Sequence, residues 1–256
     1  MRGGVTVLTA PNPGPFTLDG TRTYVVGSSS VIDPGPSIES HIEAVLAAAP
    51  RLSKIFVTHR HADHAPAALA IRQKTGARLF TPAGVFESET VDHLLQDGEI
   101  ISLDESDTLE AIATPGHTAE HFCFIAGSGE LFTGDTILGS GTTTIFPPDG
   151  DMASYLRSLR LLRERRPTRI YPGHGPVRDD AMPLIDYYIA HRLEREEQIV
   201  ALLARGGKDI ASLRESIYVD LPAALAGAAE TQLSAHLIHL CEQKRVMRKG
   251  SRFALA

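Results

Sequence analysis

A six-residue segment early in the chain carries four side chains that can bind a metal ion. It reads His-Arg-His-Ala-Asp-His over residues 59–64 and directly follows the apolar run Ile55-Phe56-Val57. Imidazole nitrogens and a carboxylate held so close together favour a cation between them, and they suit Zn²⁺, Fe²⁺ or Mn²⁺ better than Ca²⁺ or Mg²⁺. The segment therefore predicts a metal site. Its expected ligands are His59, His61, Asp63 and His64.

Three later loops share one pattern, in which a ligand-type residue follows a glycine at the end of an expected strand. They are Pro115-Gly116-His117, Thr133-Gly134-Asp135 and Pro172-Gly173-His174. Glycine lets the backbone approach closely, and a strand end is a rigid support for a ligand. Each loop alone is weak evidence. The remaining histidines lack this context: His41, His93, His121, His191, His236 and His239.

Together the segment and the three loops supply seven ligands, which is enough for two ions and too many for one. The expected partition gives one ion His59, His61 and His117, and the other Asp63, His64 and His174, with Asp135 bridging both. Each ion then keeps an open position for a shared water, as catalytic sites do, whereas structural zinc sites are closed and usually rich in cysteine. The sequence therefore predicts a catalytic centre.

The elements that position these ligands are short. Up to about Pro176 the chain alternates β-like runs with glycine and proline punctuation, interrupted by a few helices. Strands are predicted over residues 24–26, 31–33, 55–58, 78–81, 109–114, 122–125, 131–133 and 169–171. Helices are predicted over residues 37–49, from Pro66 toward Gly76, and after a cap at Asp151.

After about Arg178 the pattern becomes helical. Helices are predicted over residues 184–204, 210–218 and 223–243, followed by a two-stranded wing over 246–255 that turns at Gly250. This order is typical of a winged helix. We therefore divide the chain into a catalytic domain, residues 1–178, and a winged-helix-like domain, residues 179–256. The third helix has no basic recognition face, so we expect the second domain to cover the active site or form a homodimer contact in preference to reading DNA.

The bulk composition restricts the partners. The chain has 256 residues, 43% of them hydrophobic, with a formal net charge of −6. This charge argues against broad attraction to nucleic acid or to an anionic membrane. The first seven residues hold no apolar segment, and no run approaches transmembrane length, so we expect a cytoplasmic protein with no membrane partner. Cys123 and Cys241 are expected to be reduced thiols.

The ligand motifs, in this order, resemble those of the metallo-β-lactamase superfamily over about residues 5–178. That resemblance implies an α+β protein with a four-layer αββα sandwich, and two metal ions at one edge between the two sheets. It also implies hydrolysis. Zinc is the first expectation for the two divalent ions, with iron or manganese as the alternatives.

A narrower resemblance covers nearly the whole chain. Residues 12–24, 32–36, 134–139 and 149–151, together with the winged tail, are similar to the branch that contains β-lactamase-like protein 2. Members of that branch include a single-strand-specific endoribonuclease and polyketide thioesterases. Two positions depart from its usual pattern: Arg22 stands where asparagine is common, and Ala65-Pro66 where glycines are common. Neither is a ligand, so the departures concern substrate binding.

The chemistry expected of this set is attack by a hydroxide shared between the two ions on a carbonyl carbon or a phosphorus. Asp135 and Asp63 are the expected catalytic residues, Asp135 as the bridge and Asp63 as both ligand and proton acceptor. Asp33 is a candidate partner for the outward nitrogen of a ligand histidine, with a turn-capping carboxylate as the alternative. Thr142, Thr143 and Arg178 are candidate substrate contacts, the alternative being solvated side chains.

Several substrates fit such a centre. The best interpretation is a broad metal-dependent hydrolase of the β-lactamase-like protein 2 type that cleaves an ester, thioester or phosphodiester bond, in a small ester or thioester or in single-stranded RNA. A glyoxalase II-like thioesterase and a single-strand endoribonuclease or phosphodiesterase are alternatives, although the chain lacks tryptophan and an aromatic-plus-basic stripe for single-stranded RNA. A penicillinase is disfavoured because aspartate occupies the bridging position. The non-enzymatic alternative is a metal-binding regulator that uses the winged-helix tail.

Overall fold

The computed structural model describes residues 4–103 and 107–256. Its first sheet is mixed, with β1 to β3 antiparallel and β3 to β6 parallel. The carboxyl ends of β3, β4 and β5 therefore lie at one edge. Among the described residues, the strands follow one another in the order β1 (Val5–Thr9), β2 (Arg22–Val26), β3 (Ser30–Ile32), β4 (Lys54–Phe56), β5 (Arg78–Thr81) and β6 (His93–Leu94).

The second sheet brings three more strand ends to a common edge. In this sheet β10 and β11 are parallel, while β8 and β10 both run antiparallel to β9. As a result β8, β10 and β11 all point the same way. The spatial order is β11 (Arg169–Pro172), β10 (Glu130–Gly134), β9 (Phe122–Ala126), β8 (Thr108–Ala113) and β7 (Glu99–Ser102).

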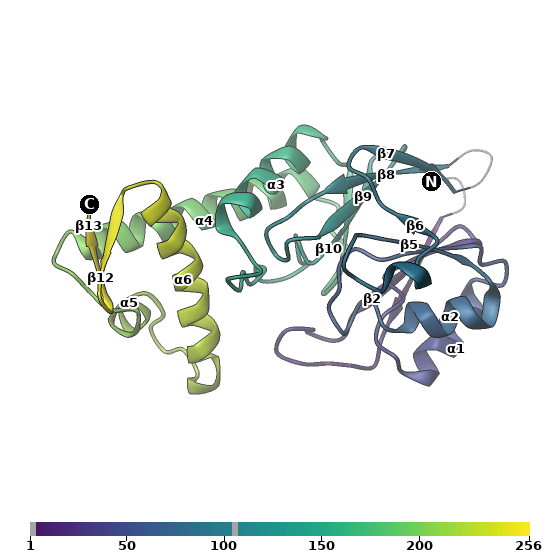
Figure 1. Cartoon of the computed structure of the whole chain (residues 1–256), viewed down its shortest axis with the longest axis horizontal. Helices are drawn as coiled ribbons and strands as arrows, with labels where there is room; N and C mark the ends of the chain where they lie inside the picture. Colours follow the sequence, from purple (N-terminus) through teal and green to yellow (C-terminus); the bar gives the residue numbers. More distant parts are fainter. Residues whose placement is uncertain (1–3, 104–106) are drawn as a thin grey trace.

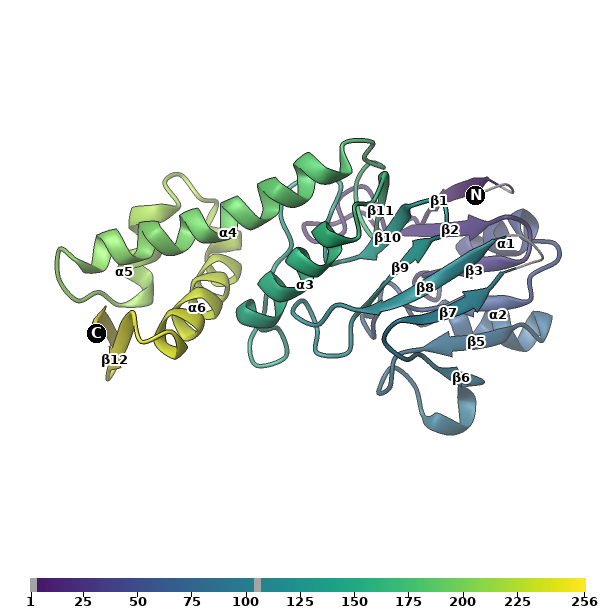
Figure 2. The same cartoon turned by 90° about the horizontal axis from the view of Figure 1, so that it is seen from above.

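The two sheets pack face to face through an aromatic core. Tyr24 and Phe56 from the first sheet meet Phe124 and Phe132 from the second, with the Phe56 and Phe124 ring centroids 5.5 Å apart. Helices α1 (Glu39–Ala48) and α2 (Ala67–Thr75) cover the outer face of the first sheet. The outer face of the second sheet is covered by α3 (Met152–Glu164) and α4 (Ala181–Leu203) (Figures 1 and 2). This is the expected four-layer αββα sandwich.

The predicted strands and helices are present, and the expected cap of α3 is confirmed, since the Asp151 carboxylate accepts from Ser154 N at 2.7 Å. Three strands and the 3₁₀ turn η1 (Ser88–Thr90) were not predicted. The missed strands are β1, β6 and β7. Each lies at or next to the edge of a sheet and exposes apolar side chains, Ile100 being 70% exposed, so their sequences lack the pattern of a buried strand.

The C-terminal region packs around a core of its own. It contains α5 (Ile210–Ile217), η2 (Ala223–Leu225), α6 (Ala226–Glu242) and the hairpin β12 (Val246–Lys249) with β13 (Arg252–Leu255). The order is that of the expected winged helix. Helix α4 runs from the sandwich into this region and contributes to both cores (Figure 2). Because one helix serves both, the domain boundary after residue 178 stays a prediction.

No helix within residues 4–103 and 107–256 combines the length and the apolar character that a membrane span needs.

Candidate metal centre

The ligand-type residues lie where the two sheets present their strand ends. The segment 59–64 follows β4, and His117, Asp135 and His174 lie on the loops that follow β8, β10 and β11. These strands end at the same edge of the sandwich for the topological reasons given above. The strand ends therefore gather ligand-type side chains from four distant segments.

All seven predicted residues come together, in the predicted partition. One group offers ligand atoms from His59, His61, His117 and Asp135, and the other from Asp63, His64 and His174, with the atoms in each group lying within 4.8 Å of one another. Asp135 lies between the groups. Its Oδ1 is 3.3 Å from Nε2 of both His64 and His174, and its Oδ2 is 3.5 Å from Nε2 of His117.

The donor atoms fit divalent metal ions. Nδ1 of His61 lies 3.1 Å from Nε2 of His117, and Nε2 of His64 lies 3.3 Å from Nε2 of His174. Within the described part of the chain, the buried atoms His59 Nε2 and Asp135 Oδ1 have no hydrogen-bond partner. Buried polar atoms that converge without partners are costly, and a cation between them satisfies all of them at once. Nitrogen and carboxylate donors suit zinc, iron or manganese.

The electrostatics of the centre also favour positive charge. Burial disfavours the protonated form of His64, but the charges of Asp135, Asp63 and Asp33 outweigh it and raise the pKa of His64 well above its usual value. Burial opposes ionisation of Asp135, yet the charges of His64 and His174 lower its pKa well below the usual value. Burial lowers the pKa of His59, which keeps this imidazole neutral, the form that binds metals.

Asp33 contacts His64 from the neighbouring strand. Because β3 is parallel to β4, the residue after β3 lies beside the start of the ligand segment. The Asp33 carboxylate accepts from Thr58 N and Thr58 Oγ1, both at 2.8 Å, and from His64 Nδ1 at 2.9 Å. The last bond directs His64 Nε2 toward Asp135. In the same way, His117 Nδ1 donates to the carbonyl oxygen of Thr144 at 3.0 Å.

His121 was excluded as a ligand, and it lies outside both groups, but it supports the centre. It is fully buried and stacks on His59 with the ring centroids 4.9 Å apart. Its Nε2 accepts from the backbone N–H of Asp135 at 3.2 Å, and its Nδ1 lies 3.0 Å from Thr114 Oγ1. No pattern around His121 in the sequence signals this contact, which depends on the pairing of β8, β9 and β10.

Two glycines in the ligand loops have no room for a side chain. A Cβ on Gly173 would lie 2.5 Å from Asp135 Oδ1 and 2.7 Å from His64 Cε1. Gly116 has a φ of +141°, and a Cβ there would lie 2.4 Å from the Cα of Tyr155. The close backbone approach expected of these loops is therefore present.

A cavity of about 260 Å³ opens over the centre. Five of the seven ligand-type residues line it, and Phe16, Leu138 and Phe146 supply an apolar wall, together with Thr143 and Thr144. The sequence did not predict the apolar wall, because loop residues carry no periodicity.

The three candidate substrate contacts lie in different places. Thr143 lines the cavity over the centre, whereas Thr142 lines a neighbouring cavity beside α4 and α6. Arg178 forms an ion pair with Asp180 at 2.6 Å, donates to the carbonyl oxygen of Gly139 at 3.0 Å, and lines a third cavity. The structure thus brings Thr143 to the centre and leaves Arg178 apart from it.

Comparison with known proteins agrees with this geometry. Residues 17–174 match the model of the metallo-beta-lactamase superfamily, and residues 210–254 match that of the beta-lactamase associated winged helix domain. A beta-lactamase-like protein 2 homolog from Caenorhabditis elegans is 36% identical over 258 residues, covering 94% of this chain and 85% of that protein.

Two further relatives extend the comparison. An atrochrysone carboxyl ACP thioesterase from Aspergillus fumigatus is 32% identical, over 84% of this chain and 73% of that protein. The crystal structure of a metallo-beta-lactamase family protein from Thermus thermophilus superimposes with a TM-score of 0.81 at 22% identity, covering 100% of this chain and 99% of that one. Since the family model matches more than half of the chain and a relative at 36% identity covers most of it, the chain belongs to the metallo-beta-lactamase superfamily.

Proposed function

We propose that this chain is a hydrolase that uses two divalent metal ions to cleave small ester or thioester substrates. Zinc is the metal that we expect first. The observation that carries the proposal is the position of Asp135 between two groups of nitrogen and oxygen donors, beneath an apolar cavity. One group would hold the first ion through His59, His61 and His117, and the other would hold the second through Asp63, His64 and His174. Asp135 would contribute one oxygen to each.

When bound, the ions supply Lewis acidity, which makes water nucleophilic at neutral pH and polarises the substrate oxygen. The chain's own residues hold and orient the reacting groups. Asp33 fixes the tautomer of His64, and Thr144 O fixes that of His117. Phe16, Leu138 and Phe146 would bind the apolar part of the substrate and displace water from it.

Asp63 is the candidate proton acceptor. Its side chain is 25% exposed to the cavity side, and its Oδ2 lies 3.2 Å from His174 Nε2 and accepts from Thr21 Oγ1 at 3.1 Å. Burial opposes its ionisation, but the charge of His64 and hydrogen bonds from His174 and His64 lower the pKa of Asp63 and keep it ionised. If Asp63→Asn kept both metals and the full rate, this role would be wrong.

A carbonyl substrate is favoured over a phosphodiester for two reasons. The relative from Aspergillus fumigatus is named as a thioesterase, and the cavity lined by the ligand-type residues has an apolar wall. A single-strand endoribonuclease remains the alternative that the same assay tests. The cytoplasmic location and the homodimer remain predictions.

One experiment tests the function. Purified protein loaded with zinc, iron or manganese is assayed against a thioester, a lactone, a β-lactam, a bis-aryl phosphodiester and a labelled single-stranded RNA, alongside metal analysis. We expect thioester hydrolysis with about two ions per chain, lost in Asp135→Ala and kept in Asp179→Ala, which changes an exposed carboxylate paired with Arg169. A single tightly held ion would contradict the two-metal proposal. Cleavage of RNA alone would assign the nuclease, and inactivity on every substrate would refute the enzyme.

A further inference from the structure

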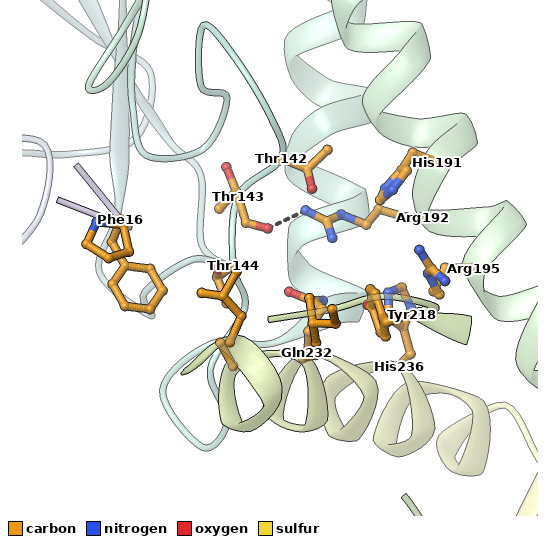
Figure 3. A pocket seen from close by; sticks show the side chains of 15 residues that line it. Phe16, Thr142, Thr143, Thr144, His191, Arg192, Arg195, Tyr218, Gln232 and His236 are labelled. Atoms are coloured by element: carbon orange, nitrogen blue, oxygen red, sulfur yellow. Dashed lines mark hydrogen bonds between the residues drawn. The ribbon is translucent and has the colours of Figure 1, made fainter. Parts of the chain in front are cut away.

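A second cavity adjoins the metal centre on its C-terminal side. It also measures about 260 Å³ and lies between the loop 142–144, helix α4 and helix α6. It shares Phe16, Thr143 and Thr144 with the cavity over the metal centre, so the two cavities adjoin. We call it the interdomain cavity. Figure 3 shows Arg192 reaching from α4 toward Thr143, and Gln232 and His236 on α6.

The interdomain cavity is lined by two arginines, Arg192 and Arg195, for which the described residues supply no ion pair. None of the described lining residues of the cavity is acidic. Arg192 is only 1% exposed, and among the described residues it forms no ion pair. Arg192 Nη2 donates to the carbonyl oxygen of Thr143, and the guanidinium lies 5.3 Å from the Tyr155 ring centroid. Arg192 Nε has no hydrogen-bond partner among the described atoms. Buried charges are normally paired, so this one indicates an anionic ligand.

Two further buried groups lack partners in the same cavity. Gln232 Oε1 accepts from Ile145 N at 2.9 Å, which fixes the amide and leaves its Nε2 without a partner among the described atoms. Nε2 of the fully buried His236 is likewise unpartnered, while its Nδ1 lies 3.5 Å from Glu196 Oε1. Arg192 and Gln232 thus present two unused donors from two different helices. Such an arrangement costs free energy unless a ligand accepts from both.

We propose that the interdomain cavity is a subsite for a carboxylate of the substrate, which Arg192 neutralises and the Gln232 amide hydrogen-bonds. The proposal rests on the proposed hydrolase function. One buried guanidinium and one neutral amide match the single charge of a carboxylate. The second arginine of the lining, Arg195, is already engaged, since it donates to Gln198 Oε1 at 2.9 Å and lies 4.5 Å from the Tyr218 ring centroid, so a phosphate dianion would require a further cation. The preferred substrates are therefore esters or thioesters whose acyl chain carries a free carboxylate at the end opposite the scissile bond.

The subsite is connected to the metal centre through one residue. Thr143 Oγ1 donates to the carbonyl oxygen of Asp135 at 2.7 Å, and Thr143 O accepts from Arg192. A carboxylate held by Arg192 is therefore positioned against the same loop that supports Asp135. This assigns the C-terminal domain a role in substrate selection, since α6 supplies Gln232 and His236.

The test compares two substrates that differ only in charge. These are the glutaryl thioester of N-acetylcysteamine, which ends in a carboxylate, and its glutaramoyl counterpart, which ends in a neutral amide. We expect wild-type protein to prefer the glutaryl thioester, and Arg192→Met to lower its kcat/KM about 10- to 150-fold, the range for a hydrogen-bonded buried charge. The glutaramoyl thioester should change less than about threefold. An equal loss on both substrates, or no preference in the wild type, would overturn the proposal.

A second pair of variants keeps the test valid if Arg192→Met fails to fold. Ala228 lines the cavity and is half-buried, so a longer side chain can be placed there. Ala228→Glu should abolish the preference for the glutaryl thioester, whereas Ala228→Gln, of equal size but neutral, should keep it. Arg160→Met, on the exposed face of α3, controls for loss of a cation elsewhere. If both Ala228 variants behave alike, size and not charge governs the cavity and the proposal is wrong.

Two further measurements separate this proposal from the hydrolase itself. Calorimetric binding of glutarate and of neutral glutaramide to wild type and Arg192→Met requires no turnover, and any contribution of the metals is common to both proteins. We expect only glutarate binding to weaken, by at least about tenfold. Thioester turnover without Arg192-dependent glutarate binding would remove the subsite and leave the hydrolase. A thioester ending in a phosphonate, if preferred to the glutaryl thioester, would assign the cavity to phosphate and overturn the carboxylate.

Discussion

The metal centre and the interdomain cavity lie side by side but are built in different ways. The centre is assembled from strand ends, with four of its seven ligand-type residues within residues 59–64. The interdomain cavity is assembled from the faces of α4 and α6 against one loop, and its buried polar groups stand alone in the sequence. We infer that the sheet edge determines the reaction and the helices determine the substrate. Changes at the two places should therefore have separable effects.

The largest expected effect comes from removing a ligand. His117→Ala should reduce the metal content from about two ions to one. It should also lower kcat/KM for the glutaryl and the glutaramoyl thioester by the same factor. That factor should exceed the roughly 10- to 100-fold cost of losing a ligand's hydrogen-bond partner. Metal analysis and kcat/KM on both substrates measure it. His93→Ala is the control, because His93 on the edge strand β6 pairs with Glu99 on β7 and belongs to neither group of ligand-type residues. Unequal losses on the two substrates would contradict the inference that the sheet edge determines the reaction and the helices determine the substrate.

A methyl group at Gly173 should act almost as strongly. The added Cβ would lie 2.5 Å from Asp135 Oδ1, so Asp135 or the loop of His174 must move. A misplacement of about 1 Å can cost roughly 100-fold in rate, and we expect such a loss on both thioesters in Gly173→Ala. Gly227→Ala is the matched control, since nothing lies within 4 Å of a Cβ there. An active Gly173→Ala enzyme with two ions would show that the loop tolerates displacement.

Asp33→Asn should have a moderate effect that is confined to the metal centre. Asp33 has a φ of +48°, which asparagine also tolerates, so the backbone should persist. The amide cannot replace the carboxylate charge facing His64, and we expect metal affinity to fall about 10- to 100-fold. Competition with a chelator measures the affinity. The ratio of kcat/KM for the two thioesters should stay unchanged at saturating metal; a changed ratio would couple Asp33 to the substrate.

The same contrast explains what could be predicted from sequence. The helices and most strands followed from local periodicity and from glycine and proline punctuation, whereas the edge strands β1, β6 and β7 did not. The seven ligand-type residues were recognisable because their types are rare and clustered. Arg192 and Gln232 were not recognisable. Their contacts, to Thr143 and to Ile145, span 49 and 87 residues, and an arginine or glutamine on a helix is ordinarily solvated. His121 was missed for the same reason, since only strand pairing brings it to Asp135.

The smallest expected effect concerns the stability of the helical side. Glu196 Oε1 on α4 lies 2.7 Å from Nδ1 of His239 and 3.5 Å from Nδ1 of His236, and both histidines are on α6. Among the described residues, these three belong to neither group of ligand-type residues. Burial raises the pKa of Glu196, but the hydrogen bonds from both histidines outweigh it and lower the pKa from the usual 4.5 to about 2. Its contribution to stability is therefore complete above about pH 4.5 and is lost as the pH falls toward 2.

His236 adds to this loss on the acidic side. Burial, with the charges of Arg192 and Arg195, lowers its pKa from 6.5 to about 4 despite the opposing influence of Glu196. The unfolded chain therefore binds a proton that the folded chain excludes between pH 6.5 and 4, and stability falls across that window. Urea unfolding of wild type and Glu196→Gln from pH 7 to pH 3 measures the difference between them, in which the contribution of the metal centre cancels. We expect the destabilisation by Glu196→Gln to be largest above pH 5 and to shrink toward pH 3. A destabilisation independent of pH would mean that Glu196 acts through packing and not through its charge. The contact between α4 and α6 would then not depend on the ionisation of Glu196.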